Sequence, residues 1–152
     1  MDRGVVGHRV HRRYLNAVVL HGLATAAAAG FNATDLYALG VLEQAGPLTA
    51  GDIATRTGLT TGAATRLIDR LVRQEVVERV VDPADRRKVV VQPVAHPDAV
   101  EQAVDPARRR VGEIIDGYSA AETAILFDYF TRAAAAFEDA TEAVRAAQRA
   151  DG

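Results

Sequence analysis

The sequence predicts a mostly α-helical fold that contains a small β-hairpin. Over most of the 152 residues, apolar side chains recur every three to four positions, the spacing that places them on one face of a helix. The period changes at residues 76–81 and 88–94, two runs rich in β-branched residues with the length of strands. The chain length fits one domain with a protruding subdomain.

The first two helices are bounded by residues that begin and end helices. The first is expected over about residues 5–29 and ends at Gly30. Asn32 is a favourable N-cap for the second, and Asp35 has the spacing of a capping box. The Gly-Pro pair at 46–47 ends that helix. Its buried stripe is expected to be Leu36, Leu39, Val41 and Leu42.

Two helices separated by a tight turn follow. Thr49 and Asp52 form a second capping signal, Gly58 ends the third helix, and Thr60 caps a fourth that runs to about Gln74. The side chains expected to face inward are Ile53, Ala54, Ala64, Leu67, Ile68, Leu71 and Val72. Those expected largely on the opposite face of the fourth helix are Thr61, Gly62, Thr65, Arg66, Asp69, Arg70 and Arg73.

The two strands enclose the polar turn Asp-Pro-Ala-Asp-Arg-Arg at 82–87, which predicts a hairpin with a long, charged tip. Two further helices are expected over about 97–118 and 120–148. The last helix has apolar residues at alternating spacings of four and three, a period typical of packed helices. They are Leu126, Phe130, Ala133, Phe137, Ala140, Val144 and Ala147. The first helix repeats this spacing in Val10, Tyr14, Ala17, His21, Ala24 and Ala28.

These repeats predict that the terminal helices pack on each other and on those of a second copy of the chain. A monomeric helix bundle with short loops is the alternative, because it uses the same spacing. The expected organisation is a helical dimerisation region, residues 1–31 and 95–152, around a lobe formed by residues 32–94.

The composition limits the possible functions. The net charge of −2 argues against a strongly basic nucleic-acid coat protein, but it divides into +1 for residues 1–47, +2 for 48–93 and −5 for 94–152. Every cation except Lys88 is arginine, which suits bidentate contacts with phosphates and bases but is also what a GC-rich genome produces. The absence of cysteine excludes disulfides, thiolate metal sites, cysteine nucleophiles and thiol redox sensing, and fits a reducing cytosol.

The N-terminal region superficially resembles a secretory signal, because arginines precede an apolar run rich in small residues. Asn16 and His21 interrupt that run, and its centre is alanine rather than leucine. We therefore expect an amphipathic helix here and a cytoplasmic protein. Since no stretch approaches about 20 strongly apolar residues, no membrane-spanning helix is expected.

The order of helix, four-residue turn at 57–60, helix and hairpin is that of a winged helix-turn-helix. In this motif the N-terminal part of the second helix faces base edges in the major groove of double-stranded DNA. Arg66 suits guanine or phosphate, whereas Arg70 and Arg73 are better placed for phosphates. Gly62 weakens the helix by roughly 1 kcal/mol relative to alanine, so either DNA approaches it closely or it is an ordinary surface glycine. The candidate residues are Thr61, Gly62, Thr65, Arg66, Arg70 and Arg73.

The hairpin tip supplies the candidate wing residues Asp85, Arg86, Arg87 and Lys88. A narrow minor groove attracts an inserted arginine. We expect Asp85 to orient an arginine, either Arg87 or Arg70, rather than to contact DNA. A solvated turn is the alternative for a charged hairpin tip.

Three segments carry a family resemblance. They are Leu-Thr-Ala-Gly-Asp-Ile-Ala-Thr-Arg-Thr-Gly-Leu-Thr at 48–60, Thr-Arg-Leu-Ile-Asp-Arg-Leu at 65–71 and Asp-Pro-Ala-Asp-Arg-Arg-Lys-Val-Val-Val at 82–91. The sequence resembles the MarR family of bacterial transcriptional regulators. This resemblance implies a homodimeric winged-helix protein, usually a repressor, that small ligands such as phenols or aromatic acids release from DNA. It further implies that helix 61–73 enters the major groove, that Arg87 reaches the minor groove, and that effectors bind between the dimerisation helices and the DNA-binding lobe.

The chain departs from the family pattern in two places. Gln-Pro-Val-Ala-His-Pro at 92–97 replaces a strand end of Leu-Thr followed by glycine, so the start of the next helix is expected to be re-angled. The cysteines of oxidant-sensing members are missing, which excludes that switch here.

The remaining candidate sites have ordinary alternatives. His8 and His11 have helical spacing for a shared metal, but solvated histidines are the more common reading, and we expect no metal or cofactor. Tyr14, His21 and Tyr37 are candidates for an effector pocket, although each also fits a core or interface position. Ser119 lacks the flanking glycines of a nucleophile elbow, and the sequence has no phosphate-binding loop, so an enzyme is not expected.

The leading hypothesis is a homodimeric, ligand-responsive DNA-binding regulator. Its two-fold symmetry predicts a near-palindromic operator with half-sites about one helical turn, ~10 bp, apart. The alternative is a winged-helix protein-interaction module without specific DNA binding. The small positive charge of residues 48–93 allows this alternative, whereas Arg66, Arg70 and Arg87 argue against it.

Overall fold

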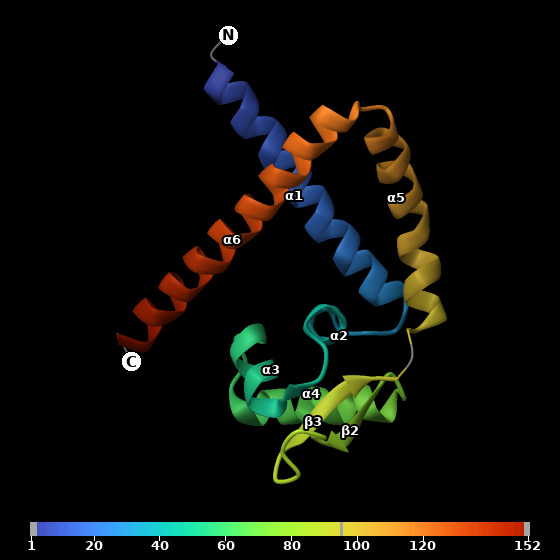
Figure 1. The fold of residues 1–152 in the computed structure, drawn as a ribbon, viewed down its shortest axis with the longest axis vertical. Coiled ribbons are helices and arrows are strands. Elements are labelled where there is room, and N and C mark those ends of the chain that lie inside the picture. The colour runs from blue at the N-terminus through green and yellow to red at the C-terminus, as the bar shows by residue number, and fades with distance from the viewer. Residues whose placement is uncertain (1–2, 95, 151–152) are drawn as a thin grey trace. The chain divides into compact units, whose positions relative to one another are not determined.

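A computed structural model describes residues 3–94 and 96–150. It confirms a mostly helical fold with a small antiparallel sheet (Figure 1). In chain order the elements are α1 (Arg3–Ala28), α2 (Ala33–Ala45), β1 (Leu48–Thr49), α3 (Ala50–Thr57), α4 (Thr61–Arg73), β2 (Val77–Val81), β3 (Val89–Pro93), α5 (Asp98–Asp116) and α6 (Ala120–Ala150).

The chain divides into two units, residues 1–104 and 105–152, and the division falls within α5. The first unit therefore includes α1 and the start of α5, both of which the sequence analysis placed with the dimerisation region. Local contacts account for this: α1 packs against α2, and the first turn of α5 is held beside the end of α2. Pro106, which lacks the backbone N–H that an α-helix uses, follows the division directly.

The caps of the helix-turn-helix form as predicted. Thr49 Oγ1 accepts a hydrogen bond from Asp52 N at 3.1 Å, and Asp52 Oδ2 accepts one from Thr49 N at 3.2 Å. Gly58 ends α3 in the left-handed conformation with φ of 72°, which a residue without Cβ adopts readily. Thr60 Oγ1 then accepts from Ala63 N at 3.3 Å and begins α4. The sequence thus determines this turn locally.

The N-cap of α2 lies at Asn32 as predicted, but the expected capping box with Asp35 does not form. Asn32 has the extended backbone of an N-cap, but its side chain accepts no capping hydrogen bond. Its Nδ2 instead donates to Asp35 Oδ2 at 3.3 Å. Asp35 turns into the protein, where only 2% of it is exposed, because an arginine of α4 binds its carboxylate.

The core of the first unit lies among α2, α3, α4 and the sheet. β3 is the central strand of the order β1-β3-β2, with Leu48 opposite Val91 and Val80 opposite Val90. The short segment Leu48–Thr49 pairs with β3 of the hairpin and forms the third strand. The buried hydrophobic cluster consists of Ala38, Leu39, Leu42, Leu48, Ile53, Leu67, Ile68, Leu71, Val76, Val77 and Val91.

The unusual segment after β3 is anchored on both sides. Val94 N donates to Val76 O at 3.1 Å, which extends the contact of the hairpin beyond Pro93. His96 then bridges two helices: its Nδ1 lies 2.5 Å from Glu43 Oε1 of α2, and its Nε2 lies 2.6 Å from Glu101 Oε1 of α5. This bridge fixes where α5 begins relative to α2.

In the second unit, α6 begins at a capping box that the sequence analysis did not identify. Ser119 Oγ accepts from Glu122 N at 3.4 Å, and Glu122 Oε2 accepts from Ser119 N at 2.9 Å. Large apolar side chains remain exposed along α6, among them Ile125, Phe127, Phe130, Phe137 and Val144. The long helix α1 of the first unit likewise exposes Val10, Tyr14, Val18, Val19, Leu20 and Leu23.

Within the described ranges, no single helix is long and apolar enough to cross a membrane. Residues 7–28 and 33–45 meet the criterion only as a pair, with a bend of 102° between them.

Candidate nucleic-acid interface

Helix α4 separates its side chains into an inner and an outer face, as the sequence predicts. Ala64, Leu67, Ile68 and Leu71 are buried, whereas Val72, also predicted to face inward, is only partly buried. The candidate residues Thr61, Gly62, Thr65, Arg66 and Arg73 are exposed. Thr65 Oγ1 donates to Thr61 O at 3.0 Å, so the hydroxyl retains lone pairs that can accept from a ligand.

Gly62 and Arg66 lie together on the exposed first turns of α4. A Cβ built on Gly62 would meet Arg66 Nη1 at 3.7 Å, an ordinary van der Waals distance, and no closer atom. The interior of the protein therefore does not require glycine at this position. Among the described residues, no acidic side chain pairs with Arg66, which leaves its guanidinium available.

Arg70 has a partner that the sequence analysis did not anticipate. Its Nε donates to Asp35 Oδ2 at 2.8 Å and its Nη2 donates to Asp35 Oδ1 at 2.6 Å. Donating these hydrogen bonds to the Asp35 carboxylate raises the pKa of Arg70 above its usual value. Two of the guanidinium nitrogens are thus bound to a buried carboxylate of α2, which restricts the phosphate contact predicted for Arg70.

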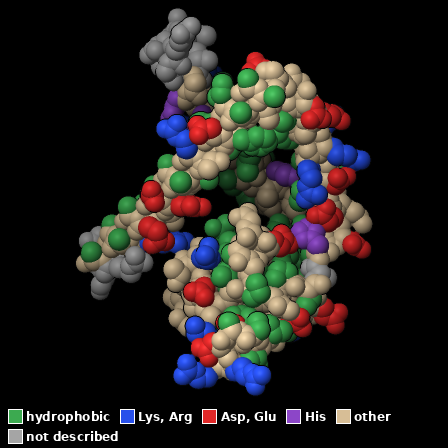
Figure 2. Space-filling view, in the orientation of Figure 1, with side chains coloured by type: hydrophobic (Ala, Val, Ile, Leu, Met, Phe, Trp, Pro, Cys, Tyr) green, Lys and Arg blue, Asp and Glu red, His purple; other side chains and the backbone are tan. Residues whose placement is uncertain are grey.

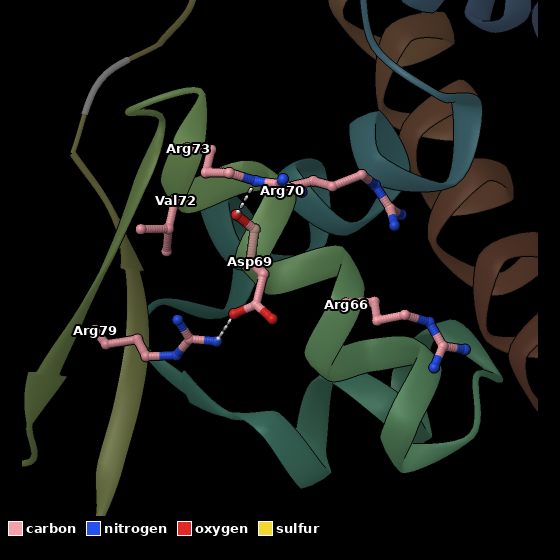
Figure 3. A pocket seen from close by; sticks show the side chains of 6 residues that line it. All are labelled: Arg66, Asp69, Arg70, Val72, Arg73 and Arg79. Carbon is pink, nitrogen blue, oxygen red and sulfur yellow. Dashed lines mark hydrogen bonds and ion pairs between the residues drawn. The ribbon is translucent and has the colours of Figure 1, made fainter.

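An open groove of about 500 Å³ lies between α4 and β2 (Figure 3). Asp69 Oδ1 accepts from Arg79 Nη2 at 2.7 Å, which links the middle of α4 to the hairpin. Arg73 Nε donates to Asp69 O at 3.2 Å along the same helix. The side chains that line the groove are Arg66, Asp69, Arg70, Val72, Arg73 and Arg79.

The hairpin tip is ordered by its two aspartates. Asp82 Oδ1 accepts from Ala84 N at 2.8 Å, and Asp85 Oδ1 accepts from Arg87 N at 3.1 Å, so two Asx turns succeed each other. Asp85 Oδ1 also accepts from Arg87 Nε at 3.2 Å. Of the two arginines expected to pair with Asp85, the structure therefore shows Arg87. Its side chain is 91% exposed.

Positive side chains gather at the end of the hairpin, where Figure 2 shows two blue patches at the base of the molecule. The sequence there places Arg86, Arg87 and Lys88 in succession, and all three are exposed. On α4 and β2, by contrast, Asp35 and Asp69 offset Arg70 and Arg79. The cations that no carboxylate neutralises in the described part of the lobe thus include Arg66, Arg73 and Arg86.

The start of β3 lies near the first turn of α3, because Val90 pairs with Thr49. Hydrogen bonds from the Thr49 side chain and backbone hold the pKa of Asp52 below its ordinary value, with smaller contributions from the charges of Arg56 and Lys88. Asp52 therefore remains ionised in the cap. Lys88 is exposed and has no ion-pair partner within the described residues.

The candidates for other sites are dispersed. His8 Nε2 accepts a 2.9 Å hydrogen bond from Arg12 Nη2, and the described residues include no group of three or more potential metal ligands. Tyr14 and Tyr37, on α1 and α2, are 50% and 57% exposed, and His21 on α1 is exposed as well. None of these three side chains is part of the core of the single chain.

Two functional features escaped the sequence analysis, the Asp35–Arg70 pair and the Asp69–Arg79 pair. The first had a detectable signal. Asp35, Leu39 and Leu42 have helical spacing, so the carboxylate occupies a position of the buried stripe and requires a cation. The second had none, because Asp69 and Arg79 belong to different elements with no shared pattern.

The capped α3 and α4, the tight turn between them and the charged hairpin define a winged helix-turn-helix protein. A sequence model of the MarR family matches residues 29–88. The helix-turn-helix transcriptional regulator YcgE of Bacillus subtilis is 33% identical over 138 residues, which cover 90% of each chain. The chain belongs to the MarR family and is a transcriptional regulator rather than an enzyme.

Solved structures show the same fold. A MarR family protein from Bacillus stearothermophilus superposes with a TM-score of 0.66 at 20% identity, covering 91% of this chain and 99% of the other. FabT of Streptococcus pneumoniae, solved in complex with DNA, gives a TM-score of 0.63 at 20% identity with the same coverage of both chains.

Proposed function

We propose that this protein binds double-stranded DNA sequence-specifically as a homodimer, and that it represses transcription until a small molecule releases it. The N-terminal turns of α4 enter the major groove, where Thr61, Thr65 and Arg66 face base edges. The wing places Arg87 in the adjacent minor groove, oriented by Asp85. The observation that carries this proposal is the exposed polar face of α4, with the unpaired Arg66 beside a glycine that the fold does not require.

Differences in pairing and exposure support separate roles for the cations of the lobe. Arg73 and the wing residues Arg86 and Lys88 are exposed and provide phosphate contacts. The lobe has only a small excess of positive charge, so phosphate attraction alone gives weak binding. Specificity and affinity therefore depend on two lobes bound at once. FabT, which shares the fold, has been solved in complex with DNA, and this supports the proposal that the present protein binds DNA.

The dimer is proposed to form through the apolar positions of α1 and α6. Seam residues Leu126, Phe130, Phe137 and Val144 recur at a period of 3.5, and the last three are exposed in the single chain. A homodimer covers such surfaces and generates a near-palindromic operator. The candidates for the effector pocket are Tyr14 and His21 of α1 and Tyr37 of α2, and a phenol or aromatic acid is the proposed ligand class.

Sequence-specific binding is tested by selecting a duplex from random DNA with the purified protein and comparing it with a scrambled duplex over a salt series. We expect the selected duplex to be near-palindromic and to bind at least about a thousandfold more tightly. Equal affinity for the two duplexes at every salt concentration would instead favour the interaction-module alternative.

Release is tested with the same duplex and a panel of phenols and aromatic acids. An effector should lower DNA affinity, and Tyr14→Phe or His21→Gln should reduce its potency without altering DNA binding in its absence. A panel that leaves the complex intact would remove the proposed ligand class.

A further inference from the structure

We propose that Asp35 is a positioning residue for DNA recognition, which acts through Arg70 to fix the rotation of α4. The inference rests on the proposed DNA-binding function and goes beyond it, because Asp35 lies outside the helix-turn-helix and does not contact the proposed DNA face. Its carboxylate is 2% exposed and accepts both hydrogen bonds of the Arg70 guanidinium.

The pairing is directional as well as charged. A planar guanidinium that donates through Nε and Nη2 to both oxygens of one carboxylate is held in a single plane. Asn32 Nδ2 donates a further hydrogen bond to the same carboxylate at 3.3 Å. Because an unpaired carboxylate at this buried position is costly, α4 is favoured in the rotation that brings Arg70 to Asp35.

A second contact reaches the same part of the protein. Gln74 Nε2, one turn beyond Arg70, donates to Gly30 O at 3.4 Å. Both contacts end on residues 30–35, which comprise the end of the α1–α2 connection and the first turn of α2 and which we call the α1–α2 corner. The carboxyl-terminal half of α4 is thus attached to the α1–α2 corner by two side chains spaced as neighbours on one helix face.

Hydrophobic packing alone does not specify the rotation of α4 so closely. Leu67, Ile68 and Leu71 bury the inner face, but apolar burial is non-directional. Contacts with base edges require side chains held to within about 0.5 Å. Asp69 and Arg79 restrain the side of α4 next to the hairpin (Figure 3). Asp35 and Arg70 restrain the side next to α2. These two restraints, from consecutive residues of α4, set the direction of Thr61, Thr65 and Arg66.

The experiment compares DNA affinity and its salt dependence for wild type, D35N, R70M and the double variant D35L/R70M. The probe is the duplex selected by the wild-type protein, and thermal unfolding of each variant is recorded alongside. D35N and R70M should bind roughly five- to thirtyfold more weakly. Their plots of log affinity against log salt should keep the wild-type slope, since no phosphate contact is lost. A direct Arg70–phosphate contact would instead lower the slope by about one in R70M.

The double variant separates positioning from stability. Apolar residues of similar volume can replace a buried ion pair without loss of stability. D35L/R70M is therefore expected to unfold at or above the temperature of D35N, and yet to bind DNA as weakly as the single variants. Wild-type affinity in the double variant would overturn the proposal, because packing would then suffice to orient α4.

Two controls distinguish this inference from the proposed function. R66A removes a proposed DNA contact on α4 and should weaken binding, whereas D128N breaks the exposed Asp128–Arg132 pair of α6 and should not. If R66A binds DNA weakly while D35N and R70M bind as tightly as wild type, the positioning role of Asp35 is rejected and the proposed DNA-binding function stands. If the wild-type protein selects no duplex, the proposed function fails. Amide hydrogen exchange in D35N then tests whether Asp35 orders α4. Unchanged protection of residues 70–74 from exchange would reject that ordering role.

Discussion

Asp85 Oδ1 accepts hydrogen bonds from both the backbone N and the side-chain Nε of Arg87, at 3.1 and 3.2 Å. An acidic residue beside a DNA-binding arginine is unfavourable if only net charge matters. Here the carboxylate closes an Asx turn and directs the guanidinium, which otherwise extends into solvent with 91% of its side chain exposed. The acid at the wing tip thus lowers the conformational freedom of the arginine before DNA arrives.

Arg87→Ala is expected to weaken binding to the selected duplex by about 1–3 kcal/mol, because it removes the proposed minor-groove contact. Fluorescence anisotropy at fixed salt measures the change. Arg132→Ala on α6 is the matched control, since that arginine is also highly exposed and pairs with a nearby aspartate. Equal affinities for Arg87→Ala and the control would show that the wing does not contact DNA.

Asp85→Asn is expected to weaken DNA binding even though it makes the wing more positive. The amide supports the turn less well and no longer holds Arg87 by charge, so ordering the arginine on DNA costs more conformational entropy. The same titration at two salt concentrations checks this. Tighter binding, increasingly so at low salt, would mean that Asp85 acts only through repulsion of phosphates.

Gly62→Ala is expected to change stability and DNA affinity in opposite directions. The new Cβ meets only Arg66 Nη1 at 3.7 Å, so helix propensity should stabilise the fold by up to about 1 kcal/mol. The same methyl group should obstruct the approach of DNA and lower affinity. Gly40→Ala in α2 is the control, because a Cβ there meets nothing within 4 Å and should raise stability alone. Undiminished affinity of Gly62→Ala would make Gly62 an ordinary surface glycine.

Thr49→Ala should destabilise the protein by about 1 kcal/mol near pH 7 through loss of the α3 cap. The folded pKa of Asp52 is lowered from 3.8, chiefly by hydrogen bonds from Thr49. That contribution is present above the unfolded pKa and is lost as the pH falls through the lowered folded value. The free energies of unfolding of wild type and variant, measured with urea, should therefore converge in strongly acidic buffer. Thr131→Ala, in the middle of α6, is the control and should show no such convergence. If the difference in free energy of unfolding between wild type and Thr49→Ala does not depend on pH, the role of Asp52 is excluded.

Phe137→Glu is expected to shift the protein from dimer to monomer, because it places a charge on an apolar seam side chain that is 51% exposed in the single chain. Sedimentation equilibrium measures the change, and DNA affinity should fall as the second lobe is lost. Asp139→Ala is the control, because Asp139 lies two residues away on α6 and is a polar residue outside the apolar seam. A dimeric Phe137→Glu variant would place the interface elsewhere.

Most of the DNA-binding lobe could be predicted because its signals are local. The Thr49 and Thr60 caps, the glycine that ends α3 and the two Asx turns of the hairpin each depend on residues within a few positions of one another. The same dependence on local signals led to the expectation of a capping box at Asn32, whose spacing to Asp35 matches one although its side chain accepts no capping hydrogen bond. Sequence spacing does not reveal that a distant cation competes for the carboxylate.

The sequence by itself determined the order of elements, the two faces of α4 and the exposed charges of the wing, because helix periodicity, capping and turn chemistry act over short distances. The tertiary structure decided which of those charges are available. Asp35 and Arg70 are 35 positions apart, and only the packing of α2 against the helix-turn-helix brings them to 2.6 Å. The physical reason is that an ion pair depends on distance and burial, neither of which is encoded in the spacing of two residues along the chain.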